Sequence, residues 1–250
     1  MIELKTKAEL ERMKKACSIS AQAIQVAQSA LKVGASTADV DDQVREYIVS
    51  QGARPTFLNY GGFPKSACIS VNEELIHGIP SKRRILEDGD IVSIDVGAFI
   101  DGFTGDNAAT FAVGNVSDEA KRLMAVTKES LLRAVEAAQP GNRIGDIGYA
   151  VQSYVEENGF SIVKDYIGHG VGRNLHEDPE VPNFGKPGHG VRLVPGMVIA
   201  IEPMVNYGEP EVEVLANDWT VVAKDRQLSA HFEYTVAITE TGPVVMTPWG

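Results

Sequence analysis

The sequence predicts an α+β fold in which helices cover one face of an antiparallel β-sheet. Helical segments are followed by strands, and this order occurs twice along the chain. The two halves also match at an offset of 107 residues: LEDGDIVSIDV at 86–96 corresponds to LVPGMVIAIEP at 193–203. A period this long exceeds that of solenoid repeats. We therefore expect a duplicated half-domain, approximately 8–115 and 116–247, within a single domain spanning 1–250.

The composition is that of an ordinary soluble globular protein. The 250 residues are 44% hydrophobic and 23% charged, and a chain of this length can bury a large core. The net charge of −11 disfavours DNA as a partner, and no apolar run reaches the roughly 18 residues that a membrane span requires. The two cysteines form no disulfide framework, and the charged start is no signal peptide. We expect a cytoplasmic monomer that binds neither DNA nor membrane.

The first half begins with two helices and continues with strands. Each helix opens with a capping box, in which a Ser or Thr precedes an acid by three residues, and this predicts helices over 6–32 and 36–52. A segment punctuated by Gly and Pro follows at 57–78. Apolar runs of β-type residues then predict strands over 91–99 and 105–113.

The second half follows the same order. The expected elements are a long helix after Ser117, a break at Pro140-Gly141, a second helix before Gly159, a polar loop over 173–190, a strand over 197–202, a hairpin carrying Trp219 and a last strand over 231–239.

Two acids fall on the strands of one predicted hairpin. Asp95 and Asp106 flank the sequence VGAFIDGFTG, whose central Asp101-Gly102 pair predicts the turn. Asp101 and Asp106 could each be simple turn residues. Asp106, however, lies in a stretch that otherwise resembles a buried strand, where an unpaired carboxylate would be costly. It therefore needs a partner.

Three candidate partners come from the second half. Glu202 is equivalent to Asp95 in the repeat, Glu233 interrupts an apolar strand, and His169 lies between glycines in IGHGVG. Each residue alone would more often be a surface or loop residue, but independent surface residues would not follow the duplication. Four carboxylates and one imidazole predict a site for one or two divalent transition-metal ions, not a thiolate zinc site.

The other histidines show no HExxH spacing, which excludes a helix-borne zinc site. If the carboxylates and His169 hold metal, His77 and His176 are free to contact substrate or move protons. His189 is expected to be a loop residue. His231 precedes Glu233 by two residues and could line the same face.

Four segments carry a close resemblance to a known family. DVGAFIDGFTGD (95–106), GHGVGRNLHEDP (168–179), VIAIEPM (198–204) and SAHFEYT (229–235) resemble the metal-ligand segments of the methionine aminopeptidases. The resemblance covers nearly the whole chain and is to the short bacterial type I form of these peptidases. It implies a pita-bread fold, with two pseudo-symmetric halves whose curved antiparallel sheet is covered by helices.

The resemblance also implies an activity and its residues. A methionyl aminopeptidase is a metallo-exopeptidase that removes the N-terminal methionine from nascent proteins when the second residue is small, through metal-activated water. Two divalent ions (Co, Mn, Fe, Ni or Zn) would be held by Asp95, Asp106, His169, Glu202 and Glu233. Glu202 would also help to move a proton, His176 would stabilise the carbonyl oxygen, and His77 would contact the amide of the second residue.

The resemblance implies a methionine pocket as well, and apolar, aromatic and thiol surface suits a flexible thioether. Its residues would be Phe57, Tyr60, Phe63, Cys68, Leu175 and Trp219. Core packing explains Phe57 and Cys68 equally well. The family more often has other residues at Phe57, Phe63, Leu175, His231 and Tyr234, which leaves the shape of the pocket open.

The sequence indicates one main partner and leaves two alternative functions open. Nascent polypeptide N-termini are the expected partner, and basic residues near the start could touch a ribosome, although a solvated helix face explains them better. One alternative is a proline-directed aminopeptidase or dipeptidase on the same scaffold. Another is a non-catalytic binding module that has kept the fold.

Overall fold

The computed structural model describes residues 1–249. Its helices are α1 (Lys7–Ala30), α2 (Thr37–Ser50), the 3-10 turn η1 (Tyr60–Gly62), α3 (Asp118–Ala137) and α4 (Ile144–Glu157). Its strands are β1 (Arg54–Pro55), β2 (Ala67–Val71), β3 (Glu74–Ile76), β4 (Ile91–Ile100), β5 (Phe103–Ala112), β6 (Ser161–Ile162), β7 (Gly168–Gly170), β8 (Glu177–Val181), β9 (Val198–Ile201), β10 (Met204–Asn206), β11 (Val212–Val214), β12 (Val221–Ala223), β13 (Ser229–His231), β14 (Glu233–Thr239) and β15 (Gly242–Val245).

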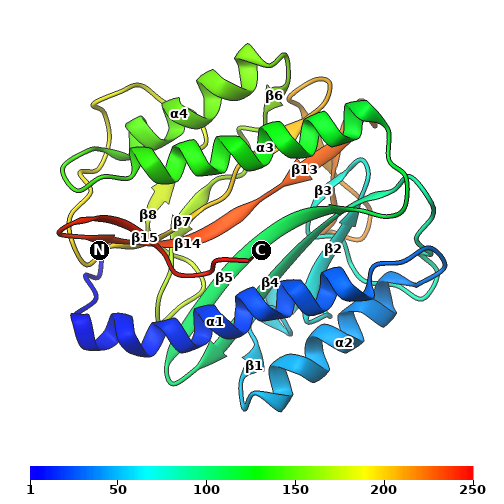
Figure 1. Ribbon diagram of the computed structural model, residues 1–250, viewed down its shortest axis with the longest axis horizontal. Helices are drawn as coiled ribbons and strands as arrows, with labels where there is room; N and C mark the ends of the chain where they lie inside the picture. Colours follow the sequence, from blue (N-terminus) through cyan, green and yellow to red (C-terminus); the bar gives the residue numbers. More distant parts are fainter. Residues whose placement is uncertain (250) are drawn as a thin grey trace.

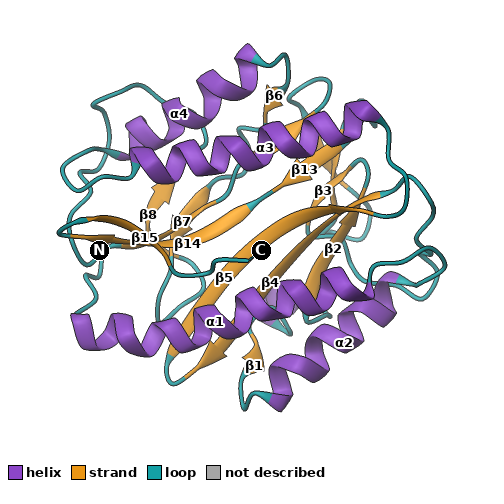
Figure 2. Cartoon of the chain, in the orientation of Figure 1, coloured by secondary structure: helices purple, strands orange, loops and turns teal. Residues whose placement is uncertain are grey.

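A nine-stranded antiparallel sheet forms the centre of the molecule. Its strand order is β1-β4-β5-β14-β9-β7-β8, with β2 paired to β4 and β15 paired to β14. Two three-stranded sheets, β13-β10-β6 and β11-β12-β3, complete the β-structure of the described residues. The predicted α+β class is confirmed, and Figure 2 shows helices and strands in separate layers.

The helices lie on one face of the central sheet. Figure 1 shows α1 and α3 across the strands, with α2 and α4 outside them. The two predicted capping boxes are present: Thr6 accepts a hydrogen bond from the backbone of Glu9, and Ser36 accepts one from Asp39. No helix among residues 1–249 is long and apolar enough to cross a bilayer. The duplication into 8–115 and 116–247 remains our proposal, which the two helix pairs flanking one sheet support.

The polar loop predicted over 173–190 is wrong in part, because it contains β8. This strand alternates exposed acids with buried Pro179 and Val181, and it pairs with β7 at the edge of the sheet. Acids and prolines normally indicate a loop, but an edge strand tolerates both because one side of its backbone needs no partner. The predicted last strand is also divided, because Phe232 separates β13 from β14.

Alternation along β4 and β5 directs different residues to the two faces of the sheet. Ile94 and Val96 belong to the main core, and Ser20 of α1 donates to the carbonyl oxygen of Val96 at 2.6 Å. Successive residues of a strand point to opposite faces, so Asp95 projects away from the helices. On β5, Gly105 permits the close approach of α1, because a Cβ there would lie 2.5 Å from the Cα of Cys17. The helix layer thus fixes the strand that carries Asp106.

Candidate metal centre and adjoining cavity

Strand register brings three of the predicted acids together. Asp95 on β4 is opposite Ala108 on β5, and Ala108 is opposite Glu233 on β14. Residues that face each other across antiparallel strands project to the same side of a sheet. Asp106 precedes Ala108 by two residues and therefore shares that side. The three carboxylates meet on the face that the helices leave uncovered.

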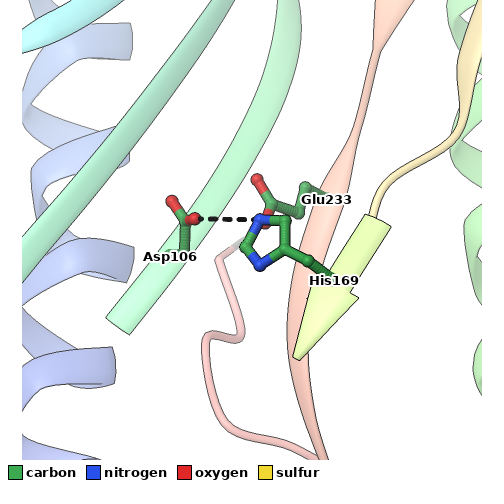
Figure 3. A group of neighbouring side chains, drawn as sticks. All are labelled: Asp106, His169 and Glu233. Carbon is green, nitrogen blue, oxygen red and sulfur yellow. Dashed lines mark ion pairs between the residues drawn. The ribbon is translucent and has the colours of Figure 1, made fainter. Parts of the chain in front are cut away.

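Glu202 and His169 approach the three carboxylates from the strands on the other side of β14. Glu202 directly follows β9, whose Ile201 is opposite Tyr234. His169 lies on β7, which pairs with β9. Its Nε2 is 3.8 Å from Asp106 Oδ2 and 3.5 Å from Glu202 Oε1. Figure 3 shows Asp106, His169 and Glu233 pointing toward one another, and one ligand atom from each lies within 4.8 Å of the others.

The hydrogen bond of His169 defines which of its nitrogens is free. Nδ1 lies 2.9 Å from the carbonyl oxygen of Gly170, and because a carbonyl only accepts, Nδ1 carries the proton. Burial and, to a smaller extent, the neighbouring His176 lower the pKa of His169 to about 4. The neutral ring therefore presents a lone pair at Nε2 to Asp106 and Glu202. A lone pair facing carboxylates is unfavourable unless a cation lies between them.

The carboxylates themselves lack partners. Asp95 Oδ1, Asp106 Oδ1 and Glu233 Oε1 are buried and form no hydrogen bond with residues 1–249. Burial raises the pKa of Asp106 to about 7. Burial and then the negative charge of Asp106 raise the pKa values of Asp95, Glu202 and Glu233 well above the usual range. These orphaned oxygens and the lone pair of His169 fit divalent transition-metal ions, which would supply the missing positive charge.

A cavity of about 240 Å³ adjoins this cluster. One wall is apolar: Phe57, Phe63, Cys68 and Leu175 form a small hydrophobic cluster of their own, and Trp219 packs against it. The rings of Phe63 and Trp219 meet edge to face at 5.2 Å. The acid cluster lines the same cavity, and Cys68 of the apolar wall is opposite Asp95 in the pairing of β2 with β4. One side chain can thus be enclosed by apolar surface while its neighbouring polar groups lie against the carboxylates.

Two further histidines line the cavity: His77 contacts Trp219 of the apolar wall, and His176 contacts His169 of the cluster. His77 contacts Tyr166 and Trp219 edge to face, and burial, followed by the repulsion that a protonated His176 would exert, lowers its pKa to about 4. His176 lies 4.3 Å from His169, measured between ring centroids, and its Nδ1 is 2.7 Å from the hydroxyl of Tyr60. Burial lowers the pKa of His176 as well. Both rings are thus neutral, and each can donate one N–H.

The structure brings every predicted site residue to this cavity. The lining includes all of the proposed metal ligands, the two substrate-facing histidines and the pocket residues, namely Asp95, Asp106, His169, Glu202, Glu233, His77, His176, Phe57, Tyr60, Phe63, Cys68, Leu175 and Trp219. Their individual roles remain predictions.

The lining also contains residues that the sequence did not indicate: Gly61, Ile76, Tyr166 and Ile167. Ile76 and Ile167 each directly precede a short segment with a predicted histidine, so sequence proximity to His77 and His169 was the available signal. His189 is exposed in its loop, as expected. His231 is buried, with Nε2 3.7 Å from Glu202 Oε2, and is not part of the lining.

Comparisons with known proteins identify the family. The model of metallopeptidase family M24 matches residues 11–240. A methionine aminopeptidase of Clostridium acetobutylicum is 51% identical over 99% of each chain, and one of Escherichia coli K12 is 42% identical over 98% of this chain and 94% of its own.

Solved structures extend the comparison. The methionine aminopeptidase of Thermotoga maritima superposes with a TM-score of 0.97 at 45% identity and covers 99% of each chain. A prolidase of Pyrococcus furiosus superposes with a TM-score of 0.80 at 29% identity, covering 99% of this chain but 66% of its own.

Proposed function

The chain belongs to metallopeptidase family M24, and from this premise we propose that it is a pita-bread metallo-exopeptidase that removes the N-terminal methionine from proteins and peptides whose second residue is small. The observation that carries the proposal is the cavity, which joins an apolar wall to a cluster of unpartnered carboxylates. Such a cavity accepts one apolar side chain and places the adjoining peptide bond at the acids.

Five side chains would hold the metal: Asp95, Asp106, His169, Glu202 and Glu233. We propose two divalent ions, because four carboxylates provide more negative charge than one ion balances; Co, Mn, Fe, Ni or Zn would suit this donor set. When bound, the ions supply an activated water and polarise the scissile carbonyl.

The apolar wall selects the first residue. The thioether of methionine is flexible and polarisable, and it packs well against the aromatic rings of Phe57, Phe63 and Trp219. The carboxylates that line the same cavity attract the positively charged amino terminus of the substrate. A chain can therefore enter only by its first residue, which explains exopeptidase activity.

Protein groups then move protons and stabilise charge. Glu202 accepts the proton of the attacking water and delivers it to the departing amide nitrogen. His176 donates a hydrogen bond to the carbonyl oxygen as negative charge develops on it. His77, whose backbone is held in the left-handed conformation at φ 58°, contacts the amide of the second residue. We further propose that the enzyme acts as a monomer in the cytoplasm on nascent chains.

A substrate panel tests the activity. Metal-loaded protein should release methionine from Met-Ala-Ser, and metal-free protein should not. Preferential cleavage of an X-Pro peptide would instead support the proline-directed alternative, which the prolidase superposition makes worth testing. Absence of both activities would favour a non-catalytic binding module.

The variant Glu202→Gln tests the proposed proton transfer. Turnover should fall roughly 100-fold or more, because Gln cannot accept a proton. Circular dichroism and metal content should be measured on the same sample, so that loss of fold or of metal is distinguished from loss of the base. An unchanged rate would reject this role for Glu202.

A further inference from the structure

A hydrogen bond links the rim of the cavity to one of the substrate-facing histidines. The hydroxyl oxygen of Tyr60 lies 2.7 Å from Nδ1 of His176, and the two rings are 5.4 Å apart at a tilt of 52°. Tyr60 is 116 residues from His176 in the chain, and its side chain is partly exposed. The contact is polar and therefore differs from the apolar packing expected of a pocket residue.

The backbone around Tyr60 holds this hydroxyl in place. The Asn59 N–H donates to the Phe63 carbonyl at 2.8 Å, and the Phe63 N–H donates to the Tyr60 carbonyl at 2.9 Å. Asn59 and Gly61 both adopt left-handed conformations, with φ 67° and 55°. Tyr60 is thus carried by a tight, internally hydrogen-bonded turn, which limits the positions available to its side chain.

The direction of the hydrogen bond follows from the chemistry of the two groups that form it. A phenol hydroxyl is a good donor and a weak acceptor, whereas an unprotonated imidazole nitrogen is a good acceptor. The short distance of 2.7 Å therefore favours donation by Tyr60 to Nδ1 of His176. A ring that accepts at Nδ1 carries its proton on Nε2, and His176 lines the cavity beside the acid cluster.

We propose that Tyr60 is a positioning residue: its hydroxyl donates to Nδ1 of His176 and thereby keeps the single proton of this ring on Nε2, where it can donate to the scissile carbonyl oxygen. The substrate part of this statement rests on the proposed function, but the tautomer does not. His169, in contact with His176, is fixed in the opposite tautomer by the carbonyl of Gly170. Two adjacent imidazoles therefore present a lone pair and a proton, as metal binding and carbonyl stabilisation respectively require.

The tautomer can be measured without metal or substrate. Long-range ¹H–¹⁵N correlation spectra of the ¹⁵N-histidine-labelled, metal-free protein distinguish protonation at Nδ1 from protonation at Nε2, and His176→Gln identifies the signals of His176. The wild type should carry its proton on Nε2. Tyr60→Phe, which removes only the hydroxyl, should shift the signals toward a mixture of tautomers. A wild-type proton on Nδ1, or identical His176 signals in wild type and Tyr60→Phe, would overturn the proposal.

Kinetics on the metal-loaded protein test the consequence for catalysis. Tyr60→Phe should lower kcat about tenfold with little change in KM, because the ring remains in the pocket. In a His176→Ala background the same change should have no further effect, since its target is gone. Equal losses in both backgrounds would show that Tyr60 acts independently of His176 and would reject the proposal. Tyr149→Phe, on the exposed face of α4, is the control for removal of a tyrosine hydroxyl. If the wild type released no methionine, the proposed function would fail while the spectra still decided the tautomer.

Discussion

Asp106 is the residue on which the acid cluster converges. Its carboxylate lies near the lone pair of His169, and its negative charge raises the pKa values of Asp95, Glu202 and Glu233. Without a cation, the folded state therefore contains uncompensated charge repulsion. The cluster is arranged for ion binding at the expense of stability of the metal-free protein.

Replacement of the Asp106 carboxylate by an amide should separate its contribution to metal binding from its cost to the stability of the metal-free protein. We predict that Asp106→Asn raises the free energy of unfolding of the metal-free protein, on the order of 1 kcal/mol, because one buried charge is removed. The same variant should lose most of the stabilisation that added metal produces. Thermal unfolding with and without Mn²⁺ measures both. The control is Asp101→Asn, an exposed acid in the turn of the same hairpin, which should retain the metal effect.

His176 and His169 are neighbours with different predicted roles. We predict that His176→Ala lowers kcat about 100-fold, because a donor to the developing oxyanion is lost. Metal content should be unchanged, because Nδ1 of His176 is hydrogen-bonded to Tyr60 and its ring is not one of the five proposed ligands. Elemental analysis of the purified protein checks this, with His189→Ala in the exposed loop as control. A metal-free His176→Ala protein would make His176 a ligand.

At the scale of elements, Asp41 connects α2 to the sheet. The backbone N–H groups of Ser66 and Ala67, at the start of β2, both donate to Asp41 Oδ1 at 2.9 Å. Asp41→Ala leaves two buried donors without an acceptor, and we predict a loss of about 2 kcal/mol in the free energy of unfolding. Asp41→Asn keeps an oxygen at this position and should cost much less. Equal losses in chemical denaturation would show that the hydrogen bonds contribute little.

The stabilities of the wild type and of Asp41→Asn should depend differently on pH. Burial raises the pKa of Asp41, so the folded state binds its proton more tightly than the unfolded chain does. The stability contributed by this protonated group is present below the unfolded pKa of about 4 and is lost as pH rises through the folded pKa. The wild type should therefore lose stability relative to Asp41→Asn as pH rises from about 4. A difference that does not change with pH would contradict this prediction.

The contact between α1 and β5 positions the carboxylate of Asp106. A Cβ at Gly105 would lie 2.5 Å from the backbone of Cys17, so helix and strand would have to separate. We predict that Gly105→Ala lowers stability by about 3 kcal/mol and weakens metal binding, because Asp106 moves with its strand. Calorimetric titration with metal measures the second effect. Gly102→Ala, at the turn of the same hairpin, would meet no neighbour within 4 Å, and its cost should be limited to local backbone strain with unchanged metal affinity.

Local features of the elements could be predicted from the sequence, whereas contacts between distant segments could not. Helix starts were predictable because capping is local: the Ser or Thr and its acid are three residues apart. The acids were predictable because a charge inside an apolar strand is anomalous. β8 was missed because an edge strand tolerates the residues of a loop. The hydrogen bond between Tyr60 and His176 was not predictable, since it depends on a turn and on the loop before β8, which are distant in sequence and meet only after the sheet has formed.

The whole molecule is organised around a narrow junction in the sheet. β5 and β14 pair through only two residue pairs, Glu233 with Ala108 and Tyr234 with Asn107. Asp95 and Asp106 lie on one side of this junction, and Glu233, Glu202 and His169 lie on β14 or beyond it. An ion held by all five would therefore connect the two sides where backbone pairing is weakest.

Metal binding should accordingly stabilise the entire molecule. Addition of Mn²⁺ at about 100 times its Kd should raise the free energy of unfolding by about 2.7 kcal/mol, because only the folded chain presents the complete site. Hydrogen exchange should slow most at the amides of β5 and β14. Because the net charge of −11 makes simple screening stabilising as well, KCl at matched ionic strength is the control. Equal shifts in Mn²⁺ and KCl would argue against a specific site.

The proposed ligands are spread from residue 95 to residue 233, and this spacing affects how the protein matures. During synthesis, the acids of β4 and β5 leave the ribosome long before Glu233 has been added. The metal site is therefore incomplete on the nascent chain. Activity should therefore arise in one step, late in synthesis, when β14 inserts between β5 and β9. By the same reasoning, proteolytic cleavage that releases β14 should cause loss of the bound metal and loss of activity together.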